Sequence, residues 1–149
     1  MEEIDLSTLL LIGIDEEHTR VYTIDSELVI NKSAKKIIED SCKFFGSSLN
    51  EKVNMTKRLV KINSKSPIVI EETRNIIFFP LKSTREKNNI WISFNNLEKY
   101  EKKNDDCLLY FKCGKQISIK FSFYIIDNQV TRSLILDYEL NKRRKSLEK

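Results

Sequence analysis

Residues 41–48 read SCKFFGSS and lie between two stretches whose apolar residues recur at helical spacing. The first stretch covers 34–45 and the second covers 49–62. Gly46 comes directly after the last apolar residue of the first stretch, where a residue in the left-handed conformation commonly ends a helix. SCKFFGSS therefore predicts the corner of a helical hairpin, and this corner decides how the first half of the chain folds.

Capping residues stand at the start of both predicted helices. Ser33 precedes the first, and Ser47 or Ser48 precedes the second. A serine hydroxyl at these places accepts a hydrogen bond from a free backbone N–H of the first turn. Glu51 follows Ser48 at the spacing of a capping box, which supports the same boundary.

Cys42 lies on the apolar side of the first helix with Phe45, so we interpret it as a core residue. A catalytic cysteine needs a nearby base, and the only histidine, His18, stands in a different segment. Use of Cys42 with His18 in catalysis is the alternative. The three cysteines are an odd number without a CxxC pair, which argues against a disulfide framework or a zinc ribbon. We expect no enzyme, no metal and no cofactor.

The second predicted helix has one apolar arc and one basic side. At 100° per residue the apolar arc consists of Leu49, Val53, Leu59, Val60 and Ile62. Opposite this arc lie Lys57, Arg58 and Lys61, with no acidic residue between them, and Lys65 follows in the next loop. The unmixed charge favours contact with phosphates, and an ordinary solvated helix face is the alternative.

The remaining segments predict an α+β fold in one domain, 1–149, with a largely antiparallel sheet, the helical hairpin in the N-terminal half and a C-terminal helix. The expected strands are short, β-branched or alternating runs at 9–14, 20–24, 27–30, 68–70, 76–79, 90–94, 97–103, 107–112 and 115–120. Cys113 and Gly114 are expected to form a two-residue hairpin turn. A polar, basic loop covers 81–89.

The last helix is expected over 123–143 and carries two apolar faces. The core face should consist of Phe123, Ile126, Val130, Leu134 and Tyr138. Off that face lie Ile125, Ile135 and Leu136. Such a helix is either deeply buried or shared with another subunit.

Charge is distributed unevenly along the chain, whose net charge is +4. Residues 1–31 hold eight acidic residues and one basic residue, so residues 32–149 carry a net charge of +11. A basic body fits a polyanionic partner, and a solvated basic surface is the alternative. The apolar run at 9–14 is too short for a membrane span and follows acidic residues, unlike a signal peptide. We expect a cytoplasmic protein without membrane contact.

Several stretches, taken together and in order, resemble the ComK family of bacterial competence transcription factors. They are SCKFFGSS at 41–48, SPIVI at 66–70, FFP at 78–80, STR at 83–85, WIS at 91–93 and NQVTR at 128–132. The resemblance implies a cytoplasmic activator of genes for DNA uptake that needs no cofactor. It implies double-stranded DNA as the partner, bound at A/T-rich boxes through the minor groove, a homo-oligomer (a dimer or a dimer of dimers), and contact with the transcription machinery.

A·T tracts narrow the minor groove and deepen its negative potential, which attracts arginine. Arg85 and Arg132 are the arginines inside the matched stretches, and the amides of Asn128 and Gln129 could reach base edges. The residues expected at the DNA are Lys57, Arg58, Lys61, Lys65, Lys82, Arg85, Lys87, Asn128, Gln129 and Arg132. The alternatives are capping or core hydrogen bonding for Asn128 and Gln129, and a salt bridge for Arg132.

Longer members of the family continue past the point at which this chain ends, in a segment tied to activation, assembly and regulated proteolysis. This difference motivates a second hypothesis. The chain would then be a protein-interaction module that forms heterodimers with a full-length competence factor or titrates it. Binding of an A/T-rich duplex by the purified protein alone separates the two hypotheses.

Overall fold

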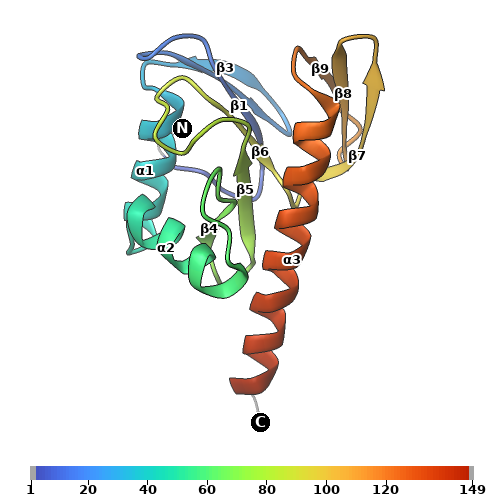
Figure 1. Cartoon of the computed structure of the whole chain (residues 1–149). Coiled ribbons are helices and arrows are strands. Elements are labelled where there is room, and N and C mark those ends of the chain that lie inside the picture. The colour runs from blue at the N-terminus through green and yellow to red at the C-terminus, as the bar shows by residue number, and fades with distance from the viewer. Residues whose placement is uncertain (1–2, 148–149) are drawn as a thin grey trace.

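The computed structural model describes residues 3–147, which form two antiparallel sheets and three helices (Figure 1). The larger sheet has six strands in the order β3-β2-β1-β6-β5-β4, and the smaller has three in the order β7-β8-β9. The strands are β1 (Thr8–Gly13), β2 (Thr19–Thr23), β3 (Glu27–Ile30), β4 (Ile68–Glu71), β5 (Ile76–Pro80), β6 (Ile90–Ser93), β7 (Leu97–Lys103), β8 (Asp106–Phe111) and β9 (Gln116–Ile119). The helices are α1 (Ala34–Phe44), α2 (Leu49–Val60) and α3 (Phe123–Leu147). The predicted α+β class, the helices in the N-terminal half and the C-terminal helix are confirmed.

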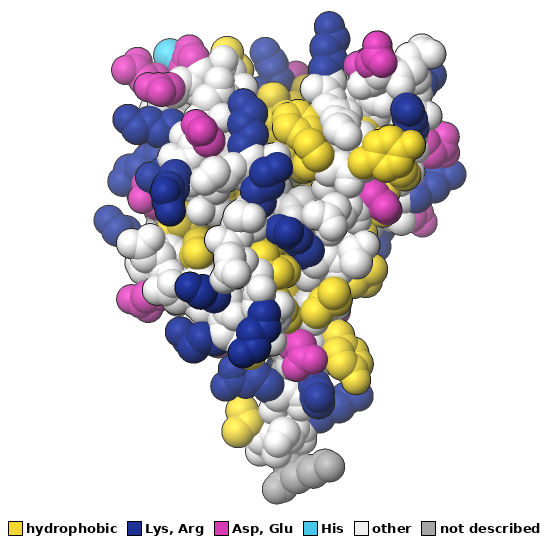
Figure 2. All heavy atoms as spheres, in the orientation of Figure 1, with side chains coloured by type: hydrophobic (Ala, Val, Ile, Leu, Met, Phe, Trp, Pro, Cys, Tyr) yellow, Lys and Arg dark blue, Asp and Glu magenta, His cyan; other side chains and the backbone are white. Residues whose placement is uncertain are grey.

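Helix α3 lies on the side of the large sheet opposite α1, and its C-terminal half extends past the sheets (Figure 1). The predicted core face of this helix is wrong in part. Leu134 and Tyr138 are 55% and 65% exposed, whereas Leu136 is buried. The inner positions are instead taken by two polar residues, Gln129 and Ser133, which are buried and hydrogen-bonded. Figure 2 shows hydrophobic side chains at the surface along this helix.

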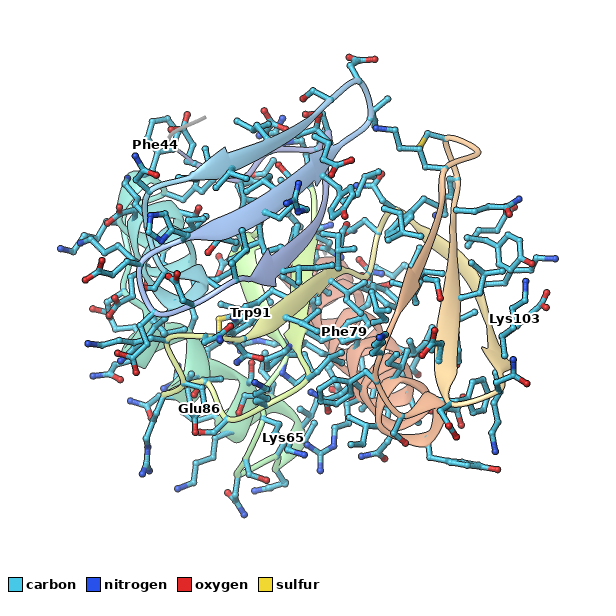
Figure 3. The ribbon with its side chains drawn as sticks, turned by 90° about the horizontal axis from the view of Figure 1, so that it is seen from above. Phe44, Lys65, Phe79, Glu86, Trp91 and Lys103 are labelled. Carbon is cyan, nitrogen blue, oxygen red and sulfur yellow. The ribbon has the colours of Figure 1, made fainter. Side chains whose placement is uncertain are left out.

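The central strands of the six-stranded sheet are buried on both faces, whereas the edge strand β3 is partly exposed. Successive residues of a central strand therefore belong to different cores. Phe78 and Trp91 pack on the side of α1, while their neighbours Phe79 and Ile92 pack on the side of the small sheet and α3. In Figure 3 Trp91 and Phe79 lie in the interior, and Phe44 lies at the outer edge. This double burial explains why strands β1, β4, β5 and β6 read as nearly continuous apolar runs.

The helical corner forms as the sequence predicts. Ser33 Oγ accepts the Lys36 N–H (3.0 Å) at the start of α1, and Ser48 Oγ accepts the Glu51 N–H (3.1 Å) at the start of α2. Gly46 follows α1 with a φ of +84°, a conformation that residues with a Cβ rarely adopt. The corner therefore depends on Gly46 and the Ser48 cap, while Ser33 caps the other end of α1.

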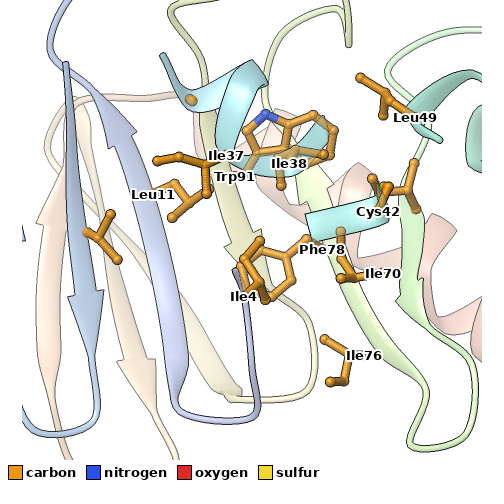
Figure 4. Packing of buried hydrophobic residues seen from close by; sticks show 13 residues of the cluster. Ile4, Leu11, Ile37, Ile38, Cys42, Leu49, Ile70, Ile76, Phe78 and Trp91 are labelled. Carbon is orange, nitrogen blue, oxygen red and sulfur yellow. The ribbon is translucent and has the colours of Figure 1, made fainter. Parts of the chain in front are cut away.

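Cys42 is fully buried under this corner, against the β-sheet core that contains Trp91 and Phe78 (Figure 4). Burial raises the pKa of the Cys42 thiol to about 11, so the nucleophilic thiolate is scarce at neutral pH. His18 instead places Nδ1 2.9 Å from an Asp15 carboxylate oxygen. The interpretation of Cys42 as a core residue fits this geometry.

Two local predictions are corrected by the structure. Helix α2 ends at Val60, and Lys61 adopts the left-handed conformation (φ 61°), so Lys61 does not lie on the helix face. Lys52 and Thr56 take buried positions of α2, because Thr56 donates to the Pro67 carbonyl (2.7 Å) and Lys52 lies 3.4 Å from Glu72. Four residues, 112–115, connect β8 to β9 where a two-residue turn was expected.

Candidate nucleic-acid interface

The loop that carries Arg85 joins β5 to β6 and is held by one buried amide. Asn89 is 1% exposed, and its Oδ1 accepts the Lys82 N–H (3.1 Å). Its Nδ2 donates to the carbonyls of Lys82 (3.3 Å) and Ser83 (3.0 Å). Because the two ends of the loop meet on this amide, the tip that bears Arg85 is fixed at its base.

The same loop is attached to two other elements. Gly13 at the end of β1 donates its N–H to the Asn89 carbonyl (2.8 Å), and Lys35 at the start of α1 donates its N–H to the Lys87 carbonyl (3.3 Å). A Cβ at Gly13 would collide with Asn88 Oδ1 and would lie 2.9 Å from the Asn89 backbone nitrogen. The close approach of the loop therefore requires glycine at position 13.

Arg85 itself is exposed at the tip of this loop. No carboxylate of residues 3–147 lies within 4.0 Å of its guanidinium. A free guanidinium on a fixed loop suits insertion into a narrow groove, because the chain is ordered before the ligand arrives.

A second loop, residues 61–66, lies next to the Arg85 loop. Lys65 has a positive φ (48°), and its carbonyl accepts a hydrogen bond from Gln129 Nε2 (2.7 Å). Gln129 Nε2 also donates to the Pro80 carbonyl (2.7 Å), and the residue is 1% exposed. Gln129 therefore connects α3 from the interior to the second loop and to the end of β5, which is the core-hydrogen-bonding alternative considered for it.

Asn128 and Arg132 lie on α3 beside the second loop. They line a hollow of about 390 Å³ together with Lys65 and Tyr124. Arg132 donates from Nη1 to the Ser64 carbonyl (2.8 Å), so its partner is a backbone oxygen and not the carboxylate of a salt bridge. Asn128 is exposed.

The structure brings only part of the predicted set together. Lys65 and Arg85 line one polar hollow of about 610 Å³ between the two loops and the α1–α2 corner. Arg58 lines a different hollow with Arg143 and Arg144 of α3, and Lys87 faces a third hollow beside α1. Lys57, Lys61 and Lys82 are exposed.

Figures 1, 2 and 3 together place loops 61–66 and 81–89 on one face of the molecule. Figure 3 shows Lys65 and Glu86 on the same side, and this side faces the viewer in Figures 1 and 2. Many Lys and Arg side chains are visible on that face in Figure 2, with fewer Asp and Glu side chains among them. We call this surface, formed by loops 61–66 and 81–89 with the adjoining side of α3, the basic face.

Sequence reasoning missed Lys35, which lines the same hollow as Lys65 and Arg85. It also missed Asn54 and Asn63 in that hollow. No periodicity marks these residues, because they come from α1, α2 and a loop that meet only in the folded chain. The sequence alone does not indicate which of the neighbouring lysines, Lys35 or Lys36, points towards the hollow.

Metal binding, membrane insertion and nucleic-acid contact each require particular charged, polar or apolar groups among the described residues. Among residues 3–147 no three His, Cys, Asp or Glu side chains are grouped so that they could hold a metal ion. No helix within that range is long and apolar enough to cross a membrane. The basic face offers ammonium, guanidinium and amide groups, which suit phosphates and base edges.

A family model described as ComK protein matches residues 2–145. The chain belongs to the ComK protein family. It is also similar to the competence transcription factor of Bacillus subtilis (strain 168), with 28% identity over 126 residues. That match covers 84% of this chain and 66% of the relative, slightly less than two thirds of the relative's length. No solved structure matches the chain.

The ComK match includes every residue of the basic face. Loops 61–66 and 81–89 and the part of α3 that contains Asn128 and Arg132 all lie within residues 2–145.

Proposed function

We propose that this ComK-family protein is a transcription regulator of competence genes that binds A/T-rich double-stranded DNA through its basic face. The observation that carries the proposal is the Arg85 loop, which presents an unpaired guanidinium on a backbone fixed by Asn89 and Gly13. In an A·T tract the narrow minor groove focuses negative potential, which favours a fixed arginine over a mobile one. Lys65 shares a hollow with Arg85, and Arg132 lies next to Lys65 in the adjoining hollow, so both are placed to contact flanking phosphates.

The test is binding of the purified protein alone to two labelled duplexes of equal length, one with an A/T-rich box and one rich in G·C. We expect a specific complex with the A/T-rich duplex that survives excess G/C-rich competitor. Equal affinity for both would contradict the A/T preference. Absence of any complex would favour the alternative, in which the chain acts by pairing with a longer competence factor.

We further propose that the protein self-associates through the outer side of α3. Four large side chains stand there at helical spacing: Tyr124, Leu134, Ile135 and Tyr138, between 48% and 67% exposed. Such a stripe is typical of an interaction site. The charges of the helix favour a second copy in antiparallel orientation. A pair centred between Leu134 and Ile135 places Asp127 beside Lys142 of the second copy, and it keeps the two basic C-terminal ends of α3 apart.

Sedimentation velocity tests this assembly. Replacement of Leu134 and Ile135 by Glu should shift the protein towards monomer while leaving its unfolding transition in place, because both side chains are about half exposed. Leu6→Glu is the matched control, since Leu6 is 47% exposed and lies outside α3. A double variant that sediments like the wild type would exclude this stripe as the contact.

A further inference from the structure

The polar hollow between the two loops and the α1–α2 corner gathers positive charge from three separate segments. Lys35 comes from α1, Lys65 from the loop after α2, and Arg85 from the loop after β5. None of these three cations has a carboxylate within 4.0 Å among residues 3–147. Like charges that line one concavity repel one another, and an anion between them removes that repulsion.

The rest of the lining consists mainly of neutral hydrogen-bonding groups. Amides are supplied by Asn54 and Asn63, and hydroxyls are supplied by Ser66 and Thr84. Glu39 is the one carboxylate in the lining, and it also faces the neighbouring hollow that contains Lys36. Amide and hydroxyl donors combined with several cations match the oxygens of a phosphate group better than they match an apolar ligand.

The backbone around the hollow is fixed before any ligand binds. The Lys35 N–H is bonded to the Lys87 carbonyl (3.3 Å), which ties α1 to the Arg85 loop. The Lys65 carbonyl is held by the buried Gln129 side chain (2.7 Å). The backbones of the three cationic residues are therefore held in place, and only their side chains have to be ordered when a phosphate enters.

We infer that this hollow is a phosphate subsite that binds the DNA backbone next to the groove entered by Arg85, with Lys35 as a previously unassigned phosphate contact. The inference rests on the proposed DNA-binding function and adds to it. Contacts to the DNA backbone hold no sequence information. Lys35 therefore sets the affinity and the register on the duplex, whereas Arg85 carries the A/T preference.

The first experiment measures the salt dependence of binding for Lys35→Ala, with Lys43→Ala as a matched control. Lys43 is exposed on the same helix and does not line the hollow. Lys35→Ala should lower the slope of log K against log salt by about 0.9, the effect of one phosphate contact. It should weaken binding to A/T-rich and G/C-rich duplexes by the same factor, and Lys43→Ala should change neither quantity.

The second experiment titrates the free protein with inorganic phosphate and follows its backbone amide signals by NMR. The amides of Lys35, Lys65 and Arg85 should shift together, and Lys35→Ala should reduce these shifts. Normal DNA binding by Lys35→Ala, with an unchanged salt slope, would overturn the subsite and leave the proposed function standing. If inorganic phosphate shifted these amide signals but the protein bound no duplex, DNA would be excluded as the source of the phosphate. The proposed function would then fall as well.

Discussion

Arg85 combines an exposed guanidinium with a backbone that the fold holds in place. Its loop closes on the buried Asn89 amide, so the side chain alone would have to be ordered in the proposed complex with DNA. The guanidinium is also weakly hydrated and loses its water more readily than an ammonium group. Because the loop is rigid, the energetic contribution of Arg85 should depend on the shape of the DNA.

Arg85→Ala should lose about 1–3 kcal/mol of binding free energy on an A/T-rich box, the scale of one specific contact. It should lose much less on a G/C-rich duplex, whose minor groove is wider. Arg85→Lys should restore only part of the loss. Fluorescence anisotropy with both duplexes at one salt concentration measures the difference.

Arg74→Ala provides the control for this prediction, because Arg74 is also exposed but is engaged by Glu71 (3.3 Å) in a different turn. It should leave both affinities unchanged. If Arg85→Ala lost the same binding free energy on both duplexes, Arg85 would contact only the phosphate backbone of the DNA.

Cys42 belongs to the core and lies outside the basic face. Cys42→Ser buries a hydroxyl among apolar side chains and should lower the free energy of unfolding by about 1–3 kcal/mol. The affinity of the folded protein for DNA should stay the same. Urea denaturation measures the stability, and Cys113→Ser, at an exposed cysteine, should have no effect on it. Full stability with lost DNA binding would contradict the structural interpretation.

At the scale of elements, the contact between β1 and the 81–89 loop positions Arg85. Gly13→Ala would push the loop away from the strand, because the added Cβ meets Asn88 and Asn89. We expect the preference for A/T-rich over G/C-rich DNA to fall, while general affinity and secondary structure are retained.

A double-mutant cycle tests this coupling. If Gly13 acts through Arg85, then adding Gly13→Ala to Arg85→Ala should cost little further A/T preference. Fully additive losses would mean that Gly13 affects DNA binding by another route.

Local signals in the sequence predict the helical corner well and α3 poorly. Ser33, Gly46 and Ser48 act within one turn of themselves, so their roles can be inferred from neighbours alone. The inner face of α3 is set by distant partners, because Gln129 binds the carbonyls of Lys65 and Pro80. Periodicity assigns the inner face to apolar residues and therefore cannot find a buried glutamine.

The candidate site shows the same limit. The motif that contains Arg85 could be recognised from its sequence, whereas its juxtaposition with Lys35 depends on packing between α1 and the 81–89 loop. Arg58 and Lys61 illustrate the opposite error. A helical projection grouped them, and the end of α2 at Val60 separates them.

For the molecule as a whole, the proposed function requires the basic face to recognise DNA from the minor groove. Inosine–cytosine pairs separate the two grooves, because inosine lacks the amino group that guanine places in the minor groove. An I·C pair thus presents the minor-groove pattern of A·T and the major-groove pattern of G·C.

The decisive measurement is the affinity of the protein for three duplexes that differ only in the box: A·T pairs, I·C pairs and G·C pairs. Minor-groove recognition predicts that the I·C box binds within about threefold of the A·T box, and that the G·C box binds at least about tenfold more weakly, a difference of about 1.4 kcal/mol. An I·C box that binds as weakly as the G·C box would place recognition in the major groove and contradict the account.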